Sequence, residues 1–325
     1  MRVFATRALP GRALEHLAGE VRLEVWPGAG TPPRAELLRR AAKLDGLLCT
    51  LSDGVDADCI AAAPSLRAIS SCSVGTDHVD LAAASARGIP VGHTPGVLAE
   101  TTADLAFALL MAAARRLVEA DRFVREGAWR DWQPGLLLGR DVHGATLGGI
   151  GLGAVGQAVA RRATGFGMKV LGWSRSGRRF GGIEIVELAD LLRLSDFVSL
   201  HVALAPETRG LIGRAELGLL RPGAVLVNTA RGGLVDEAAL AESLAGGRLA
   251  AAALDVFERE PLPKDDPLLA APNLVLAPHI GSASVATRVR MAELSVQNLL
   301  AGLRGEPLPH CANPEFAKFA KPLRR

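Results

Sequence analysis

Only four cysteines occur among the 325 residues, and no two of them form a CxxC pair or another spacing typical of metal ligands. They are Cys49, Cys59, Cys72 and Cys311, and we expect them to be free and mostly buried thiols. The scarcity and scatter of cysteine therefore predict that the protein has no disulfide, no zinc site and no other metal site.

Long apolar runs and blocks of one charge are also missing. No stretch of about 18 uninterrupted apolar residues indicates a membrane span, and no N-terminal segment has the pattern of a secretory signal. The 37 basic and 34 acidic residues leave a net charge of only +3, and no basic block with interleaved aromatics occurs. These absences argue against nucleic-acid and membrane partners, and we expect a cytoplasmic protein.

The residues that are present predict an α/β protein of about two domains, because 49% of the chain is apolar and its length exceeds that of one typical domain. Short apolar runs alternate with helical patterns over the first 95 residues, with strands expected at 2–6, 21–26, 46–51, 67–72 and 89–93. Such a βα repeat is typical of a parallel sheet covered by helices.

A second βα series follows a long helical stretch at about 99–126, whose length suggests a connector between domains. Its expected strands are 145–150, 168–173, 196–202, 224–230, 249–257 and 273–278, and a last helix is expected at about 282–302. The predicted fold is therefore two Rossmann-like or flavodoxin-like α/β domains with parallel sheets. A dinucleotide-binding domain (99–287) is inserted into a discontinuous substrate domain (1–98 and 288–325).

A glycine motif, GLGAVG at 151–156, lies between the first strand and the first helix of the second series. In this context G-x-G-x-x-G is typical of a dinucleotide-binding turn, in which the pyrophosphate approaches the N–H groups at the start of a helix. We expect all six residues of the motif to border the cofactor: Gly151, Leu152, Gly153, Ala154, Val155 and Gly156.

The acidic residue that binds the ribose hydroxyls of NAD is absent from the end of the next strand. Ser174, Arg175 and Ser176 occupy that position instead. A hydroxyl and a guanidinium suit a 2′-phosphate, so we expect NADP(H) to be preferred, with NAD(H) as a possible second cofactor. The alternative is that these residues form only a solvated loop.

Polar residues that follow other strands suit the reduction of a 2-keto acid. Arg231 can hold a carboxylate bidentately, and the main-chain N–H groups of Val74 and Gly75 can bind the same carboxylate. His279 can donate a proton to the carbonyl oxygen, and Glu260 can orient the imidazole and favour its charged form. Each of these residues alone has an ordinary structural explanation, such as capping a turn.

In order and spacing, GLGAVG, NTARGGLVDE, LDVFEREPLP and LAPHIGSAS resemble the signatures of D-isomer-specific 2-hydroxyacid dehydrogenases. The resemblance implies that Arg231 is the substrate arginine and that Glu260 and His279 are the acid/base pair. Together with the positions of residues at strand ends, the resemblance also implies further cofactor contacts. These are Arg231, His279, Thr102, His201, Thr208, Thr229, Ala230, Asp255 and Gly281.

Three further stretches, GLLCTLSD, GAWRDWQP and NLLAGLRGEPLP, resemble the glyoxylate/hydroxypyruvate reductases within that family. This resemblance implies a homodimer in which Trp132 reaches the active site of the partner subunit, and it places Leu51 at an apolar contact that limits substrate size. For Trp132, ordinary interface or core packing is an equal alternative. The sequence departs from the family at Gly149, where a bulkier apolar residue is usual.

The expected activity is thus NADPH-dependent reduction of glyoxylate to glycolate and of hydroxypyruvate to D-glycerate, with His279 as proton donor. Two alternatives stay open: a sibling dehydrogenase of the D-lactate or phosphoglycerate type, and a nucleotide-sensing protein similar to transcriptional co-repressors of this fold. Rapid turnover of a keto acid would separate an enzyme from a sensor.

Overall fold

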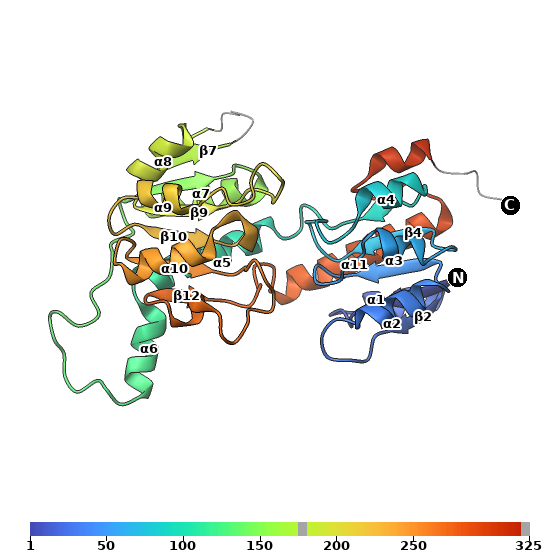
Figure 1. The fold of residues 1–325 in the computed structure, drawn as a ribbon, viewed down its shortest axis with the longest axis horizontal. Helices are drawn as coiled ribbons and strands as arrows, with labels where there is room; N and C mark the ends of the chain where they lie inside the picture. Colours follow the sequence, from blue (N-terminus) through green and yellow to red (C-terminus); the bar gives the residue numbers. More distant parts are fainter. Residues whose placement is uncertain (175–180, 320–325) are drawn as a thin grey trace. The chain divides into compact units, whose positions relative to one another are not determined.

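Two parallel β-sheets organise the chain (Figure 1). The computed structural model describes residues 1–174 and 181–319. Its internal contacts divide the chain into unit 1, which comprises Met1–Leu98 and Ala283–Arg325, and unit 2, which comprises Ala99–Ser282. Each unit contains one sheet, so the predicted fold class of two parallel α/β sheets is confirmed.

Unit 1 has a five-stranded sheet in the order β2-β1-β3-β4-β5, which is the doubly wound order of flavodoxin-like folds. Its strands are β1 (Arg2–Ala5), β2 (Arg22–Val25), β3 (Gly46–Cys49), β4 (Ala68–Ser71) and β5 (Val91–Gly92). Its helices are α1 (Ala13–Glu20), α2 (Arg34–Ala41), α3 (Ala57–Ala61), α4 (Leu81–Ala86), α11 (Val285–Arg304) and the 3₁₀ helix η3 (Pro314–Lys318).

Three helices of unit 1 begin at a short polar side chain that caps them. Asp56, Asp80 and Ser284 accept hydrogen bonds from backbone N–H groups in the first turns of α3, α4 and α11, which satisfies donors that have no partner within the helix. Helix α11 then packs against β3, β4 and α1, so the last long helix of the chain completes the core of its first unit.

Unit 2 has seven parallel strands in the order β12-β11-β10-β9-β6-β7-β8. The strands are β6 (Thr146–Ile150), β7 (Lys169–Trp173), β8 (Glu184–Ile185), β9 (Phe197–Leu200), β10 (Val225–Asn228), β11 (Ala251–Leu254) and β12 (Leu274–Leu276). The helices are α5 (Ala99–Ala114), α6 (Leu117–Arg125), α7 (Ala154–Gly165), α8 (Leu188–Leu194), α9 (Arg214–Leu219), α10 (Glu237–Ala245), and the 3₁₀ helices η1 (Gly232–Leu234) and η2 (Pro267–Ala270).

Both faces of the unit 2 sheet are buried, as the apolar strand sequences require. In β10, Val225 and Val227 join the core beneath α5 and α7, whereas Leu226 joins the core beneath α8, α9 and α10. The order of strands reverses beside β6, so β6 and β9 flank a topological switch point, where ligands of such sheets bind beyond the carboxyl ends of the strands.

The expected helix at 99–126 is two helices in the structure. The chain adopts a left-handed conformation at Arg116, with φ of 52°, which separates α5 from α6. Helix α5 belongs entirely to unit 2, where it packs against α7, β10 and β11. Helix α6 contributes no buried residue, and Figure 1 shows it and the segment that follows extending away from the unit 2 sheet.

No helix among the described residues is both long enough and apolar enough to cross a bilayer. Three histidine, cysteine, aspartate or glutamate side chains do not come together as a metal site anywhere in the two described ranges.

Gly149, in the middle of β6, has room for a side chain. A Cβ there would have its nearest neighbours at 3.8 Å, on Leu152 and Leu171, and the backbone is not left-handed. Since alanine restricts the unfolded chain more than glycine does, Gly149→Ala should raise the free energy of unfolding by about 0.5 kcal/mol. Urea denaturation measures the change.

The neighbouring glycine provides the matched control for that prediction. A Cβ at Gly148 would lie 2.4 Å from Ser195 Oγ and 2.5 Å from Leu191 Cδ2. Gly148→Ala should therefore destabilise the protein by about 1–3 kcal/mol through overpacking. If the two variants lost stability equally, there would be no free space beside Gly149.

Candidate functional site

The glycine motif forms the turn between β6 and α7 at the switch point. Gly151 has φ of 98°, and a Cβ there would lie 2.7 Å from the carbonyl of His201. A Cβ at Gly156 would lie 2.0 Å from the carbonyl oxygen of Gly151, whereas Gly153, at the N-cap of α7, has open space around it. The turn is therefore closed toward β9 and open above the first N–H groups of α7, where an anion can bind.

Three polar side chains, whose buried polar atoms have no partner in the part of the chain that the structure describes, lie beyond the carboxyl ends of the strands near this turn. They are Ser174 after β7, His201 after β9 and Thr229 after β10; the Ser174 Oγ, the Thr229 Oγ1 and both ring nitrogens of His201 have no hydrogen-bond partner among the described residues. Burial lowers the pKa of His201 to about 4, so its ring is neutral near pH 7. Orphaned polar atoms are costly unless a ligand satisfies them, so this edge of the sheet fits a dinucleotide. Arg175 and Ser176 lie outside the described residues.

A histidine and a carboxylate are paired beyond β11 and β12. The Nδ1 of His279 lies 2.7 Å from Glu260 Oε2, and the Phe257 N–H donates to Glu260 Oε1 at 3.0 Å. Burial works to raise the pKa of Glu260, but the hydrogen bonds from His279 and Phe257 and the charges of His279 and Arg231 outweigh it, and the pKa is lowered. Glu260 is therefore ionised near neutrality, and it fixes the Nδ1–H tautomer of His279 and leaves Nε2 available.

Asp255 holds the loop that carries His279. His279 has a left-handed backbone with φ of 55°, and its N–H donates to the Asp255 carbonyl at 2.8 Å. The next two N–H groups, of Ile280 and Gly281, each donate to the Asp255 carboxylate at 2.7 Å. Burial raises the pKa of Asp255, and these N–H groups oppose the shift. Three successive hydrogen bonds thus stabilise a conformation that is uncommon for a residue other than glycine.

Arg231 follows β10, and the side chain of Asn228 clamps its backbone. Asn228 Nδ2 donates to the Arg231 carbonyl at 2.8 Å, and Asn228 Oδ1 accepts from the Ala230 N–H at 3.0 Å. The Arg231 guanidinium donates to the Ala230 carbonyl at 2.8 Å and is close enough to Glu260 to lower the pKa of that carboxyl. The structure therefore brings Arg231, Glu260 and His279 together at one edge of the unit 2 sheet.

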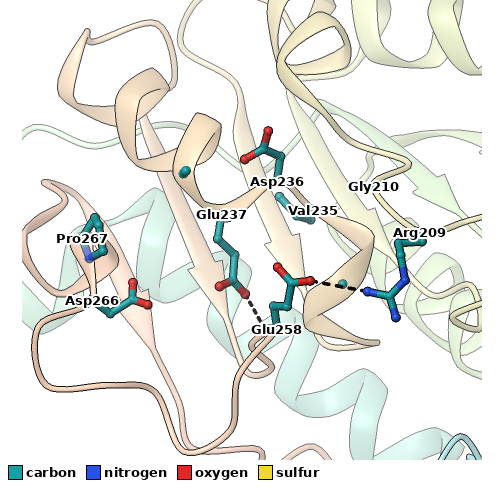
Figure 2. Close-up of a pocket in the computed structure, with 10 residues that line it drawn as sticks. Arg209, Gly210, Val235, Asp236, Glu237, Glu258, Asp266 and Pro267 are labelled. Carbon is teal, nitrogen blue, oxygen red and sulfur yellow. Dashed lines mark hydrogen bonds and ion pairs between the residues drawn. The ribbon is translucent and has the colours of Figure 1, made fainter.

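A pocket of about 420 Å³ is lined by Arg209, Glu237 and Glu258, the last of which precedes Glu260 by two residues (Figure 2). Figure 2 shows Glu237, the first residue of α10, reaching the backbone N–H of Glu258 at 2.7 Å, and Arg209 paired with the Glu258 carboxylate at 3.4 Å. Burial raises the pKa of Glu237, and the charges of Asp266, Glu258 and Glu260 add to the shift. Glu237 thus holds the backbone of the loop that leads to Glu260.

The remaining predicted residues are placed as follows. Thr102, in α5, is buried, and its side chain lies 3.3 Å from a Cβ built on Gly281. The Thr208 hydroxyl donates to the Ala203 carbonyl at 2.7 Å and so stabilises its own loop. Leu51, Val74 and Gly75 follow strands of unit 1, and Trp132, which is 80% exposed, lies in the segment after α6.

Sequence reasoning missed the residues that hold the site in place. The sequence does not single out Asn228 or Glu237, and it does not indicate that Asp255 also clamps the His279 loop. The available signal is position alone, because Asn228 and Asp255 both lie near the carboxyl ends of expected strands.

Comparison with known proteins gives consistent results. Residues 107–281 match the model for "D-isomer specific 2-hydroxyacid dehydrogenase, NAD binding domain". Glyoxylate reductases of Korarchaeum cryptofilum and Thermococcus litoralis are 50% and 44% identical, each over 99% of this chain and over 98% and 99% of their own lengths.

Solved structures agree with the sequence comparison. The TT0316 protein from Thermus thermophilus is 50% identical with a TM-score of 0.92, over 96% of this chain and 100% of that one. An NADPH-dependent glyoxylate/hydroxypyruvate reductase from Sinorhizobium meliloti, in complex with NADP and malonate, is 32% identical with a TM-score of 0.84, over 97% of each chain.

Proposed function

The chain belongs to the D-isomer-specific 2-hydroxyacid dehydrogenase family and is an NAD(P)-dependent oxidoreductase, and from this premise we propose that it reduces glyoxylate to glycolate and hydroxypyruvate to D-glycerate, using NADPH. The observation that carries the proposal is the hydrogen-bonded His279–Glu260 pair beside Arg231, at the same sheet edge as the dinucleotide turn. The names of the relatives, which include glyoxylate reductases at up to 50% identity, supply the substrate class.

In the proposed reaction, the Arg231 guanidinium binds the substrate carboxylate and orients the neighbouring carbonyl. When bound, the nicotinamide supplies a hydride to the carbonyl carbon. As the carbonyl oxygen gains negative charge, His279 donates the proton from Nε2, and the neutral imidazole is reprotonated from solvent. Glu260 stays ionised and keeps the ring oriented through Nδ1, so the charged imidazolium is stabilised before the proton moves.

Three residues of unit 1 are also proposed to contact the substrate. The N–H groups of Val74 and Gly75 are proposed donors to its carboxylate, and the apolar side chain of Leu51 limits the size of the substituent on the carbonyl carbon. Thr102, Thr208, Ala230 and Gly281 border the cofactor in this proposal, with Asp255 near the nicotinamide.

We also propose that the enzyme is a homodimer in which Trp132 reaches the partner's site. The support is the unburied helix α6 and a group of exposed apolar side chains on and after it: Leu117, Val118, Val124, Trp129, Trp132 and Leu138. Sedimentation equilibrium at micromolar concentration should give twice the chain mass of 33.9 kDa, and a single-chain mass would exclude the proposal.

The proposed preference for NADPH rests on Ser174, whose buried hydroxyl has no hydrogen-bond partner among the described residues, and on Arg175, the next residue in the sequence. One charge-assisted hydrogen bond contributes about 1.5–3 kcal/mol, so kcat/KM with saturating glyoxylate should favour NADPH over NADH by at least about tenfold. Arg175→Ala should remove most of this preference with little effect on kcat/KM for NADH. Equal use of both cofactors by the wild type would show that these residues do not select the 2′-phosphate.

The same assay tests the activity itself. Turnover of glyoxylate or hydroxypyruvate at a rate typical of enzymes supports a reductase. Binding of a nicotinamide dinucleotide without turnover of any 2-keto acid would instead favour a nucleotide sensor.

A further inference from the structure

The loop after β4 in unit 1 has three successive backbone carbonyls, and a hydrogen bond holds each of them. The Ser73 carbonyl accepts from the Thr94 N–H at 2.8 Å, and the Val74 carbonyl accepts from His93 Nδ1 at 3.0 Å. The Gly75 carbonyl accepts from the Ser73 hydroxyl at 2.7 Å. The donors come from the segment after β5 and from a buried serine, so all three carbonyls are tied to the body of unit 1.

The N–H groups of the same peptides have no partners within residues 1–174 and 181–319. In a trans peptide the C=O and N–H bonds point in opposite directions, so each fixed carbonyl directs the next N–H away from the group that holds it. The N–H groups of Val74, Gly75 and Thr76 make no hydrogen bond to any described residue. Successive free N–H groups in a loop form a site for an anion.

We propose that His93 and Ser73 are positioning residues for the substrate carboxylate. By holding the Val74 and Gly75 carbonyls, they aim the N–H groups of Gly75 and Thr76 at the carboxylate, so that Thr76 supplies a donor beyond the expected Val74 and Gly75. This inference rests on the proposed reduction of a 2-keto acid, and it adds the residues that set the geometry of that site.

Two buried networks hold the positioning residues in turn. Asn298 of α11, which is fully buried, donates to the His93 carbonyl at 2.8 Å and accepts from the His310 N–H at 2.9 Å. This arrangement fixes the backbone from which the His93 side chain reaches Val74. A site that is ordered before binding loses less entropy when the substrate arrives.

The second network sets which group donates in each hydrogen bond that leads to Ser73. Its oxygen lies 2.7 Å from Ser71 Oγ, which lies 2.8 Å from His78 Nε2. Since Ser73 donates its only hydroxyl proton to Gly75, Ser71 must donate to Ser73, and His78 must donate to Ser71 from Nε2. The chain of donors therefore ends on the Gly75 carbonyl, as the proposal requires.

The test replaces His93 in the full-length enzyme. His93→Leu removes the donor, whereas His93→Asn keeps an amide nitrogen at the same number of bonds from the backbone as Nδ1. The readouts are kcat and KM for hydroxypyruvate, and the Kd of oxamate, an unreactive analogue with the same carboxylate, from its effect on the fluorescence of bound NADPH. Ser73→Ala provides a second, independent removal, and thermal unfolding monitors the fold of each variant.

We expect His93→Leu and Ser73→Ala to raise both KM and the oxamate Kd about tenfold, which corresponds to the loss of about one well-placed hydrogen bond, with a smaller change in kcat and in NADPH affinity. His93→Asn should restore both values to within about threefold of the wild type. Unchanged KM and Kd in His93→Leu, or an Asn variant as impaired as the Leu variant, would overturn the inference. If the wild type binds oxamate and reduces keto acids and the variants do so equally well, only the inference about His93 and Ser73 fails. If the wild type neither binds oxamate nor reduces keto acids, the proposed function itself fails.

Discussion

Replacing His279 with asparagine should lower kcat for glyoxylate by about 10²–10⁴-fold, which is the usual contribution of a general acid. Asparagine can still donate a hydrogen bond toward Glu260, so the loop and its three hydrogen bonds to Asp255 should persist. Affinity for NADPH should therefore stay within about twofold, since the turn at 151–156 and the orphaned side chains near it are unchanged. Stopped-flow turnover and NADPH fluorescence titration measure the two quantities.

Glu260→Gln is the control that separates orientation from charge. Glutamine can accept the hydrogen bond from His279 Nδ1 but carries no negative charge to stabilise the imidazolium. Because reduction requires the charged ring, Glu260→Gln should lower kcat/KM although the orientation of His279 is kept. An His279→Asn enzyme that kept more than about a tenth of wild-type turnover would show that another group donates the proton.

The sequence predicted the sheets well, because apolar runs in parallel strands are buried on both faces and stand out from their neighbours. The ends of strands were less well predicted. The expected strand at 249–257 ends at Leu254 in β11, because Asp255 turns away to bind the N–H groups of Ile280 and Gly281. Those partners lie about 25 residues further along the chain, so no local pattern could indicate them.

The break between α5 and α6 has a similar cause. The segment 99–126 contains neither proline nor glycine, and its residues favour a helix throughout. In the structure, the Ala114 carbonyl accepts a hydrogen bond from the Arg140 N–H at 2.8 Å, and Gly139 packs so closely there that a Cβ would lie 2.4 Å from that carbonyl oxygen. A contact formed by a distant segment ends the helix, and helical propensity alone could not predict it.

In the candidate site, too, some residues could be predicted from the sequence and others could not. Arg231, Glu260 and His279 could be predicted because reactive side chains at strand ends converge in any parallel sheet. The residues that support these side chains could not be predicted. Asn228 binds backbone atoms two and three residues away and Glu237 binds a loop 21 residues away, and only the folded chain brings these groups together.

Gly232→Ala should have the largest effect of any single methyl group near this site. A Cβ at Gly232 would lie 1.8 Å from the backbone carbon of Phe257 and 2.1 Å from the backbone nitrogen of Glu258. Main-chain atoms cannot rotate aside as a side chain does, so the segment after Arg231 and the loop that carries Glu260 must move apart by more than about 1 Å. A displacement of that size can cost about 10²-fold in rate, and we expect kcat/KM for hydroxypyruvate to fall by at least that factor.

Gly233→Ala is the matched control for that prediction, because the nearest atoms to a Cβ there are the ends of flexible side chains, Arg209 Nη1 at 3.1 Å and Leu204 Cδ1 at 3.4 Å. These groups can shift, so Gly233→Ala should keep kcat/KM within about threefold of the wild type. Both variants are assayed well below their melting temperatures, so that lost activity reports on the site rather than on unfolding. If the two variants were equally active, the contact between Gly232 and the 257–258 peptide would not set the position of Glu260. If only Gly232→Ala lost activity, this contact would fix the distance between the substrate arginine and the acid/base pair.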